Sequence, residues 1–392
     1  MNKRFSVLFI LLAFMLTACY SLNVNKRGVY AEGDNFLNIE SKCAYMIDAE
    51  SGEKIYALNE NERRPIASMC KIMTLLLSFE EIDNGSFDLE STVTVGENAA
   101  KMGGSQVFLE ANADYKVKEL IKSIVVASAN DASVAMAEKI SGSEEEFVVK
   151  MNEKAKELNM CDTVFVNCTG LPKAGQFSSA KDVSTMFKEL IKHKDYFTFS
   201  KIWMDEVTHP KGRKTEISNT NKLIRFYDGC DAGKTGYTSE AGHCVCCSAE
   251  RNGMRFISVV IKAPDSKTRF KDASVMLNYG FNNYENKVVV EDKPLELNLK
   301  VEKGKKDTLT VSPEKPISIL TKKGETRNVE VNFAPVSPIV APVQKGDIVG
   351  KISVYEQGIL ISSVNVVSDE DVEKAAFSDY IKSIIIKWGV TD

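Results

Sequence analysis

The chain has 392 residues, of which 44% are hydrophobic and 27% charged, a composition typical of a globular protein long enough for two or three hydrophobic cores. Its 50 basic and 54 acidic residues leave a net charge of −4, which provides no basic footprint for nucleic acid. We therefore expect neither a disordered chain nor a protein that binds DNA or RNA.

Residues 1–19 predict an export signal. Lys3 and Arg4 precede an apolar run that is too short for a membrane span. The run ends in "LTAC", residues 16–19, which resembles the lipobox of bacterial lipoproteins, whose cysteine is lipidated. An ordinary cleaved signal with a chance cysteine is the alternative. We expect an exported protein at the outer face of the cytoplasmic membrane, with Cys19 as a candidate lipid anchor.

Residues 38–284 predict one α+β domain. Alternating segments on either side of "ESG" predict a β-hairpin over residues 43–61, and a helix is expected from Ser68 to about Asp83, with Gly85 as its C-cap. The middle, to about residue 200, is mostly helical in pattern, strands return over 205–262, and a helix follows over 271–284. Strands at both ends with helices between them predict one antiparallel sheet packed with helices.

Residues 287–370 predict a second, all-β domain. Short β-rich runs alternate there with turn signals, as in a small β-sandwich, and no cluster of His, Asp or Cys suggests chemistry. The tail, residues 371–392, predicts an amphipathic helix. Its apolar face comprises Phe377, Tyr380, Ile381, Ile384, Ile385 and Trp388. The pattern fits a helix in a membrane interface, and also a helix docked on the β-domain.

Eight cysteines follow Cys19, and their spacing shows no disulfide framework. The tightest cluster, "HCVCC" at 243–247, lies in an alternating apolar run that predicts two strands around "RNG". Because C-x-C-C lacks the paired ligands of zinc modules, we interpret these cysteines as buried small hydrophobes rather than as a metal site. We expect free thiols, no metal and no cofactor.

The stretch "RPIASMCKIMTLLL", residues 64–77, places Ser68 three positions before Lys71 at the start of an apolar helix. On a helix these two side chains project on the same side, close enough for the amine to take the hydroxyl proton. Burial and the positive end of the helix disfavour the ammonium form, so Lys71 can act as a base at neutral pH. Cys70 is rotated toward the core. A capping serine with a snorkelling lysine is the bland alternative.

Two later motifs strengthen this interpretation. In "VVASANDAS", residues 125–133, Ser128 and Asn130 stand in a turn between helical runs and can direct a hydroxyl and an amide into a cleft, although an N-cap is an equal explanation. In "CDAGKTGYTSEAGH", residues 230–243, Lys234 and Thr235 can receive a carboxylate, while Gly236 permits close backbone approach. The order S-x-x-K, S-x-N, K-T-G is the signature of penicillin-recognising serine acyltransferases.

Around these motifs the chain resembles the D-alanyl-D-alanine carboxypeptidases among the low-molecular-mass penicillin-binding proteins, most closely their sporulation-type branch. The likeness covers roughly residues 38–375 and includes "GGSQVFLE", "NCTGLPKAGQFSSAKD", "NTNKLIRFYDGCDAGKTGYTSEAGH" and "KGDIVGKISVYEQG". It implies a penicillin-binding, β-lactamase-like transpeptidase fold, followed by a β-sandwich and a membrane-associating C-terminal helix. The implied partners are peptidoglycan stem peptides ending in D-Ala-D-Ala, β-lactams and the membrane surface.

The resemblance also implies a role for each motif residue. Ser68 is the acylated nucleophile, Lys71 its base, and Ser128 and Asn130 relay protons and bind the substrate backbone. The terminal carboxylate is held by Lys234 and Thr235, with help from Arg269 in "SKTRFKDASVMLNYGF". Gly236 lets the strand approach, and the backbone N–H groups of Ser68 and Tyr237 form the oxyanion hole.

Three residues depart from the family pattern. Cys70 stands where threonine is usual, Cys168 where this branch has proline, and Thr169 where other branches have histidine. We expect little effect from Cys70, a looser loop at Cys168, and an influence of Thr169 on substrate preference.

The sequence also bears on other functions that a chain with these motifs could have. None of His193, His209 and His243 lies in a nucleophile-elbow context, which disfavours a Ser-His-Asp hydrolase. The segment 161–182 has no acid suited to the deacylating role of a β-lactamase glutamate. A DD-endopeptidase that cuts cross-links, and a non-catalytic wall-binding membrane protein, remain as alternatives.

Overall fold

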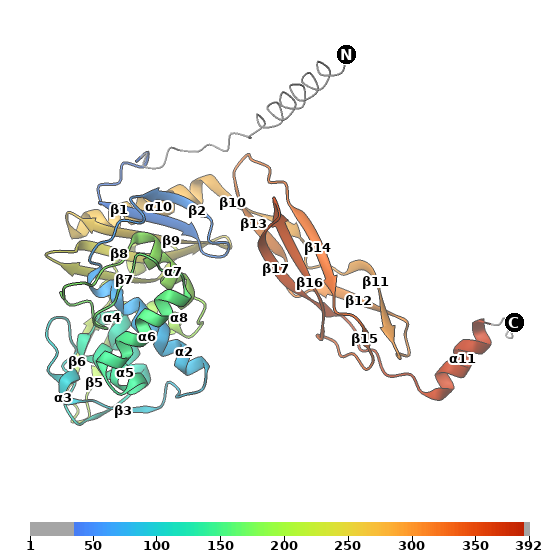
Figure 1. The fold of residues 1–392 in the computed structure, drawn as a ribbon, viewed down its shortest axis with the longest axis horizontal. Coiled ribbons are helices and arrows are strands. Elements are labelled where there is room, and N and C mark those ends of the chain that lie inside the picture. The colour runs from blue at the N-terminus through green and yellow to red at the C-terminus, as the bar shows by residue number, and fades with distance from the viewer. Residues whose placement is uncertain (1–34, 388–392) are drawn as a thin grey trace, which may run out of the picture. The chain divides into compact units, whose positions relative to one another are not determined.

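A computed structural model describes residues 35–387 of the chain, and the predicted export signal with Cys19 lies outside them. A five-stranded antiparallel sheet holds strands from both ends of the first domain, in the order β2-β1-β9-β8-β7 (Figure 1). These strands are β1 (Cys43–Asp48), β2 (Lys54–Leu58), β7 (Cys230–Thr238), β8 (Gly242–Arg251) and β9 (Met254–Ala263). The predicted sheet built from both ends of the domain is confirmed.

Most helices of this domain lie between β2 and β7 in the sequence, and one follows β9. They are α2 (Lys71–Asp83), α3 (Glu97–Ala100), α4 (Val117–Ala127), α5 (Asn130–Ser141), α6 (Glu144–Glu157), α7 (Ala180–Leu190), α8 (Tyr196–Ser200), α9 (Leu223–Phe226) and α10 (Ser266–Asn283). Their starts follow local chemistry: Ser143, Ser179 and Asp265 accept backbone N–H groups at the beginnings of α6, α7 and α10. Two hairpins complete the domain: β3 (Thr92–Thr94) with β4 (Asp114–Lys116), and β5 (Met204–Thr208) with β6 (Lys214–Ser218).

Helix α2 lies in the centre of the hydrophobic core, because its residues from Lys71 to Phe79 are all buried. The predicted helix from Ser68 is correct in place but not in type at its first turn. Residues 67–70 form a 3₁₀ turn, η1 (Ala67–Cys70), and the α-helix begins at Lys71. Side chains three positions apart eclipse one another in a 3₁₀ turn, so this geometry also brings Ser68 toward Lys71.

The predicted strands around "RNG" are confirmed as β8 and β9, and Cys244, Cys246 and Cys247 are fully buried on β8. All eight cysteines in the described part of the chain are free thiols. Within that part, no group of three His, Cys, Asp or Glu side chains is placed to hold a metal ion.

An all-β domain follows, and the first strand after α10, β10, begins at Tyr284. Its strands are β10 (Tyr284–Val290), β11 (Leu295–Glu302), β12 (Thr308–Pro313), β13 (Ile317–Lys322), β14 (Glu330–Pro335), β15 (Ile339–Val340), β16 (Ile348–Glu356) and β17 (Ile359–Ser368). They form a six-stranded sheet, β14-β16-β17-β12-β11-β15, and the pair β10-β13. The domain has its own core, in which Val311, Val354 and Val366 are fully buried.

The tail forms the helix α11 (Phe377–Lys387), and Trp388 lies beyond the described residues. Its apolar side chains are open to solvent, from Phe377, which is 79% exposed, to Ile385, which is 40% exposed. No helix within residues 35–387 is both long enough and apolar enough to cross a membrane.

Candidate active site

The S-x-x-K motif stands where η1 runs into α2. Lys71 Nζ lies 3.0 Å from Ser68 Oγ and donates a hydrogen bond to the backbone oxygen of Thr169, 2.6 Å away. Ala67, just before the serine, has a φ of +48°. A non-glycine residue in this left-handed region stores strain, which is common at functional sites.

Lys71 is completely buried, and burial lowers the pKa of its amine from 10.5 to about 8. The carboxylate of Asp131 acts in the opposite direction and raises this pKa. The net lowering of the Lys71 pKa is therefore due mainly to desolvation of the charged form, which is the effect that the sequence predicted. A substantial fraction of Lys71 is therefore neutral near pH 8, and a neutral amine can accept the proton of a serine hydroxyl.

The S-x-N motif joins α4 to α5. Ser128 caps α4 in a left-handed conformation, with a φ of +60°, and its Oγ accepts a hydrogen bond from Lys234 Nζ at 2.7 Å. Asn130 is the first residue of α5, and its Nδ2 donates to the backbone oxygen of Gly103 at 2.7 Å. Its Oδ1 is buried without a hydrogen-bond partner in the described part of the chain, which leaves an acceptor available for a substrate.

The K-T-G motif lies on β7, the edge strand of the five-stranded sheet. Lys234 is buried, and desolvation, followed by the charges of Lys71 and Arg269, holds its pKa well below the ordinary value. A Cβ on Gly236 would lie 2.6 Å from the backbone oxygen of Ile66. Glycine therefore allows β7 to run directly against η1 and the nucleophile.

Arg269 reaches the same strand from α10. Its Nη1 donates to the backbone oxygens of Gly236 and Cys244, at 3.2 and 3.3 Å, and its buried Nε has no partner in the described region. Lys71, Lys234 and Arg269 thus form a group of largely buried cations, none of which is ion-paired to a carboxylate within residues 35–387. Such a group attracts an anionic ligand.

Comparison with known proteins decides the family. Residues 29–265 match the D-alanyl-D-alanine carboxypeptidase family, and residues 284–374 match the C-terminal domain of penicillin-binding protein 5. The chain belongs to the D-alanyl-D-alanine carboxypeptidase family. This confirms the family, the serine hydrolase class and the fold that the three motifs predicted.

The relatives match over nearly the whole chain. D-alanyl-D-alanine carboxypeptidase DacF of Bacillus subtilis is 43% identical over 89% of this chain and 90% of its own length. Penicillin-binding protein 5 of Haemophilus influenzae is 30% identical, with a TM-score of 0.65 over 86% of this chain and 98% of that structure. PBP3 of Streptococcus pneumoniae, described as a peptidoglycan synthesis regulatory factor, is 27% identical, with a TM-score of 0.74 over 86% of this chain and 100% of that structure.

The loop over residues 167–171 contributes to this carboxypeptidase site in a way that sequence patterns missed. Its Thr169 oxygen binds Lys71, and a Cβ on Gly170 would lie 2.0 Å from the backbone oxygen of Ala67. Cys70 Sγ donates to the oxygen of Asn167 at 3.2 Å, so Cys70 is buried as predicted and faces this loop. Thr74 also donates to the Cys168 oxygen, at 2.8 Å, and the looser loop at Cys168 stays a prediction.

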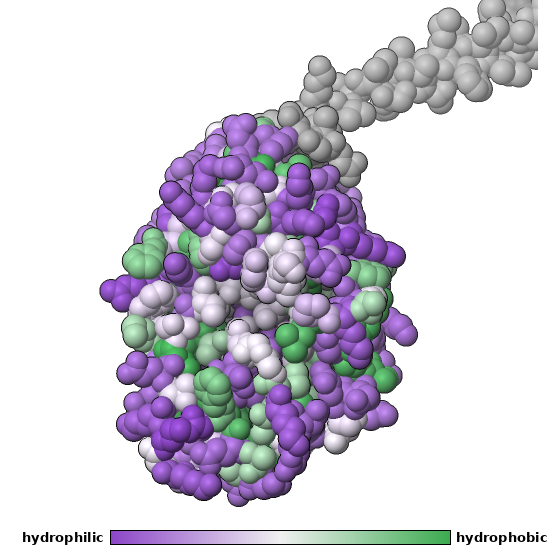
Figure 2. Space-filling model, turned by 90° about the vertical axis from the view of Figure 1, so that its left-hand side faces the viewer, coloured by the Kyte–Doolittle hydropathy of each residue, from purple (hydrophilic) through white to green (hydrophobic). Residues whose placement is uncertain are grey.

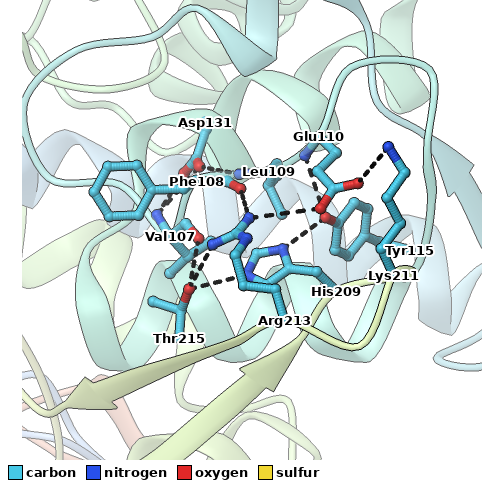
Figure 3. A network of polar contacts seen from close by, with 10 residues as sticks. All are labelled: Val107, Phe108, Leu109, Glu110, Tyr115, Asp131, His209, Lys211, Arg213 and Thr215. Atoms are coloured by element: carbon cyan, nitrogen blue, oxygen red, sulfur yellow. Dashed lines mark hydrogen bonds and ion pairs between the residues drawn. The ribbon is translucent and has the colours of Figure 1, made fainter.

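A second loop, residues 103–110, supports the S-x-N motif. Besides the Gly103 contact, the backbone N–H of Asn130 donates to the Ser105 oxygen at 2.7 Å. The buried carboxylate of Asp131 accepts the backbone N–H groups of Val107 and Leu109, which flank Phe108 (Figure 3). The motif and the loop are therefore one hydrogen-bonded unit.

The β5–β6 hairpin binds this loop from outside, as Figure 3 shows. Arg213 donates to the Phe108 oxygen at 2.5 Å, and Thr215 donates to the Val107 oxygen at 3.3 Å. His209 lies between the hydroxyls of Tyr115 and Thr215, at 2.7 and 2.9 Å. His209 thus holds the loop in place from a position remote in sequence.

The other two histidines contact side chains other than Ser68. His193 lies 2.6 Å from Asp83, and His243 stacks on Tyr237 with ring centroids 4.4 Å apart. Tyr237, which belongs to the edge strand β7, is 59% exposed. On the face of the molecule drawn in Figure 2, paler, weakly polar residues gather across the middle, and strongly hydrophilic residues dominate the rim.

Proposed function

We propose that this carboxypeptidase removes the terminal D-alanine from peptidoglycan stem peptides through an acyl-enzyme on Ser68. The observation that carries the proposal is the buried Lys71 amine, 3.0 Å from Ser68 Oγ and with a pKa of about 8. A lysine in that state is matched to the task of a general base near neutral pH.

In the acylation step, Lys71 takes the hydroxyl proton and Ser68 Oγ bonds to the carbonyl carbon of the penultimate D-alanine. The peptide C–N bond then breaks, and the leaving amine of the last D-alanine takes up a proton. In this proposal Ser128, whose Oγ accepts a hydrogen bond from Lys234 Nζ at 2.7 Å, passes that proton. Water later hydrolyses the ester and regenerates Ser68.

The developing oxyanion is held by the backbone N–H groups of Ser68 and Tyr237. The close approach of Gly236 to η1 supports this assignment, since a Cβ there would lie 3.1 Å from the Ser68 nitrogen. Each such donor is typically worth about 3 kcal/mol. The terminal carboxylate binds Lys234, Thr235 and Arg269, and the substrate backbone binds the free Oδ1 of Asn130.

β-Lactams acylate the same serine in this proposal, because they present a carbonyl and a carboxylate at a similar spacing. A solved relative, penicillin-binding protein D2 of Listeria monocytogenes, is described in its ampicillin-bound form. Slow hydrolysis of the penicilloyl ester then blocks the site.

We also propose that the chain is exported and acts in the cell envelope. The export signal over residues 1–19, with Cys19 as a lipid anchor, rests on the sequence pattern alone. The exposed apolar side chains of α11, including Phe377, Ile381 and Ile384, support a helix that lies in the membrane interface. The same proposal includes a catalytic domain over residues 38–284 and a β-domain over residues 287–370. It also includes membership of the sporulation-type branch.

The deciding experiment measures D-alanine release from a diacyl-Lys-D-Ala-D-Ala peptide, with Ser68→Ala as control. Release by the wild type alone supports both the reaction and the nucleophile. Penicillin labelling of Ser68 without release, together with cleavage of a cross-linked dimer, would favour a DD-endopeptidase. The absence of both labelling and release would favour a non-catalytic wall-binding protein.

A further inference from the structure

The hydrogen bond from Lys71 to Thr169 bears on catalysis because of the geometry of an amine. A neutral lysine amine has two N–H bonds and one lone pair. When one N–H is directed at the Thr169 oxygen, 2.6 Å away, the lone pair can turn toward Ser68 Oγ, 3.0 Å away. The position of a backbone carbonyl therefore sets the direction in which the base accepts its proton.

That carbonyl belongs to the peptide unit between Thr169 and Gly170, and the Asn167 side chain holds the opposite end of the same unit. Asn167 Oδ1 accepts the Gly170 N–H at 2.7 Å. In a trans peptide the N–H and C=O point in opposite directions within one rigid plane. Asn167 on one side and Lys71 on the other therefore clamp a single peptide plane between them.

Asn167 is itself firmly held. Its Oδ1 also accepts the Thr169 N–H and Gln176 Nε2, both at 3.2 Å, and its Nδ2 donates to the Leu171 oxygen at 2.9 Å. Gln176 Oε1 in turn accepts the N–H groups of Val166 and Asn167. The Asn167 side chain is buried, so this arrangement is shielded from competing water.

We propose that Asn167 is a positioning residue for acylation, which aims the Lys71 lone pair at Ser68 through the Thr169 carbonyl. The proposal rests on the proposed role of Lys71 as the base. It assigns a function in the reaction to a side chain that none of the three motifs contains.

Two substitutions move the pH dependence of acylation in opposite directions. Asn167→Ala frees the peptide plane, so the Lys71 ammonium loses a fixed acceptor, and the midpoint of the rate's rise with pH moves to lower pH. The plateau rate should fall by about 10- to 100-fold, as for a misplaced catalytic group. Asn167→Asp keeps the acceptor and adds a negative charge about 7 Å from Lys71 Nζ, which moves the midpoint up by about one pH unit or more.

Asn152, on α6, provides a matched control, because its side chain binds the chain segment just before Asn167. Its side chain accepts the Phe165 N–H at 3.0 Å and donates to the oxygens of Phe165 and Val148 at 2.8 and 2.9 Å. Asn152→Ala therefore removes a similar set of hydrogen bonds, but none to the peptide unit that contacts Lys71. It should lower stability and leave the pH midpoint unchanged.

The experiment measures the second-order rate of acylation by a fluorescent penicillin, from about pH 5.5 to 10, in the full-length protein. Each rate is normalised to the amount of protein that labels at completion, so partial misfolding does not enter. Opposite midpoint shifts in Asn167→Ala and Asn167→Asp, with none in Asn152→Ala, are expected. If Asn167→Ala does not fold, the upward shift in Asn167→Asp carries the test.

The Lys71→Ala variant distinguishes the proposed role of Lys71 as the base from the proposed role of Asn167 as a positioning residue. Loss of acylation in Lys71→Ala, together with wild-type midpoints in the Asn167 variants, would overturn the positioning role alone. Normal acylation in Lys71→Ala would show that Lys71 is not the base, and the positioning role of Asn167 would then be wrong as well.

Discussion

Replacement of Lys71 by methionine should stabilise the protein near neutral pH while abolishing acylation. Burial lowers the Lys71 pKa from 10.5 to about 8, a difference that corresponds to about 3 kcal/mol. Below pH 8 the folded protein carries a buried ammonium at that cost. Between pH 8 and 10.5 the unfolded chain binds more protons than the folded one, so wild-type stability rises with pH, and above 10.5 the cost is gone.

Lys71→Met also removes the hydrogen bonds to Ser68 Oγ and the Thr169 oxygen, and an unsatisfied buried carbonyl costs about 1–3 kcal/mol. That loss is the same at every pH. The diagnostic quantity is therefore the change, between pH 7 and 10.5, in the difference between variant and wild type. We expect the variant to lose about 3 kcal/mol of relative stability over that interval.

The assay is urea unfolding followed by tryptophan fluorescence, to which Trp203 of the first domain contributes, at several pH values. Lys101→Met, a change at a side chain that is 75% exposed, controls for the removal of one positive charge. The reasoning would be refuted if the stability difference between Lys71→Met and wild type were constant from pH 7 to 10.5. Such a result would mean that burial of the Lys71 ammonium does not cost the folded protein stability.

Further predictions concern separate parts of the molecule. Gly170→Ala should abolish penicillin labelling, because its Cβ would lie 2.0 Å from the Ala67 oxygen; labelling at the wild-type rate would contradict this. Arg269→Gln should lower kcat/KM by at least about 10-fold for a peptide with a free terminal carboxylate and much less for its amide; equal losses would exclude carboxylate binding. Ile384→Asp, on the exposed face of α11, should reduce co-sedimentation of the full-length protein with anionic vesicles, whereas unchanged binding would leave that helix without a membrane role. A maleimide applied to the native protein should modify Cys161, the exposed thiol of the described region, before the buried ones, as peptide mass mapping will show; uniform labelling would indicate an open core.

The motifs could be predicted because each depends on local spacing. Ser68 and Lys71 are three residues apart, and that interval places them together in an α-helix and in the 3₁₀ turn that forms here. The edge strand that carries Lys234 follows from alternation and glycine content. Local spacing did not predict the 3₁₀ turn, which lies where Gly170 and Gly236, both distant in sequence, approach residues 66–67.

Contacts between distant segments carry the rest of the site, and no local pattern encodes them. Thr169 reaches Lys71 through a backbone oxygen, so the identity of its side chain gives no signal. His209 supports the loop over residues 103–110 from a hairpin that follows most of the helices in sequence. The family resemblance includes the segments "GGSQVFLE" and "NCTGLPKAGQFSSAKD". The structure gives a physical reason, because both segments bind motif residues through backbone atoms.

The cations of the site link its stability to its function. Lys71 and Lys234 both have lowered pKa values because burial disfavours their charged forms, and Arg269 adds a third positive group. A protein selected for stability alone would pair these groups with carboxylates or replace them with apolar side chains. Their unpaired state is useful only if a negative group enters the site, and a peptide that ends in a free carboxylate brings one. A carboxylate bound near Lys234 and Arg269 would also offset the repulsion that Lys234 experiences from Lys71 and Arg269, so part of the electrostatic cost of the empty site would be relieved when substrate arrives.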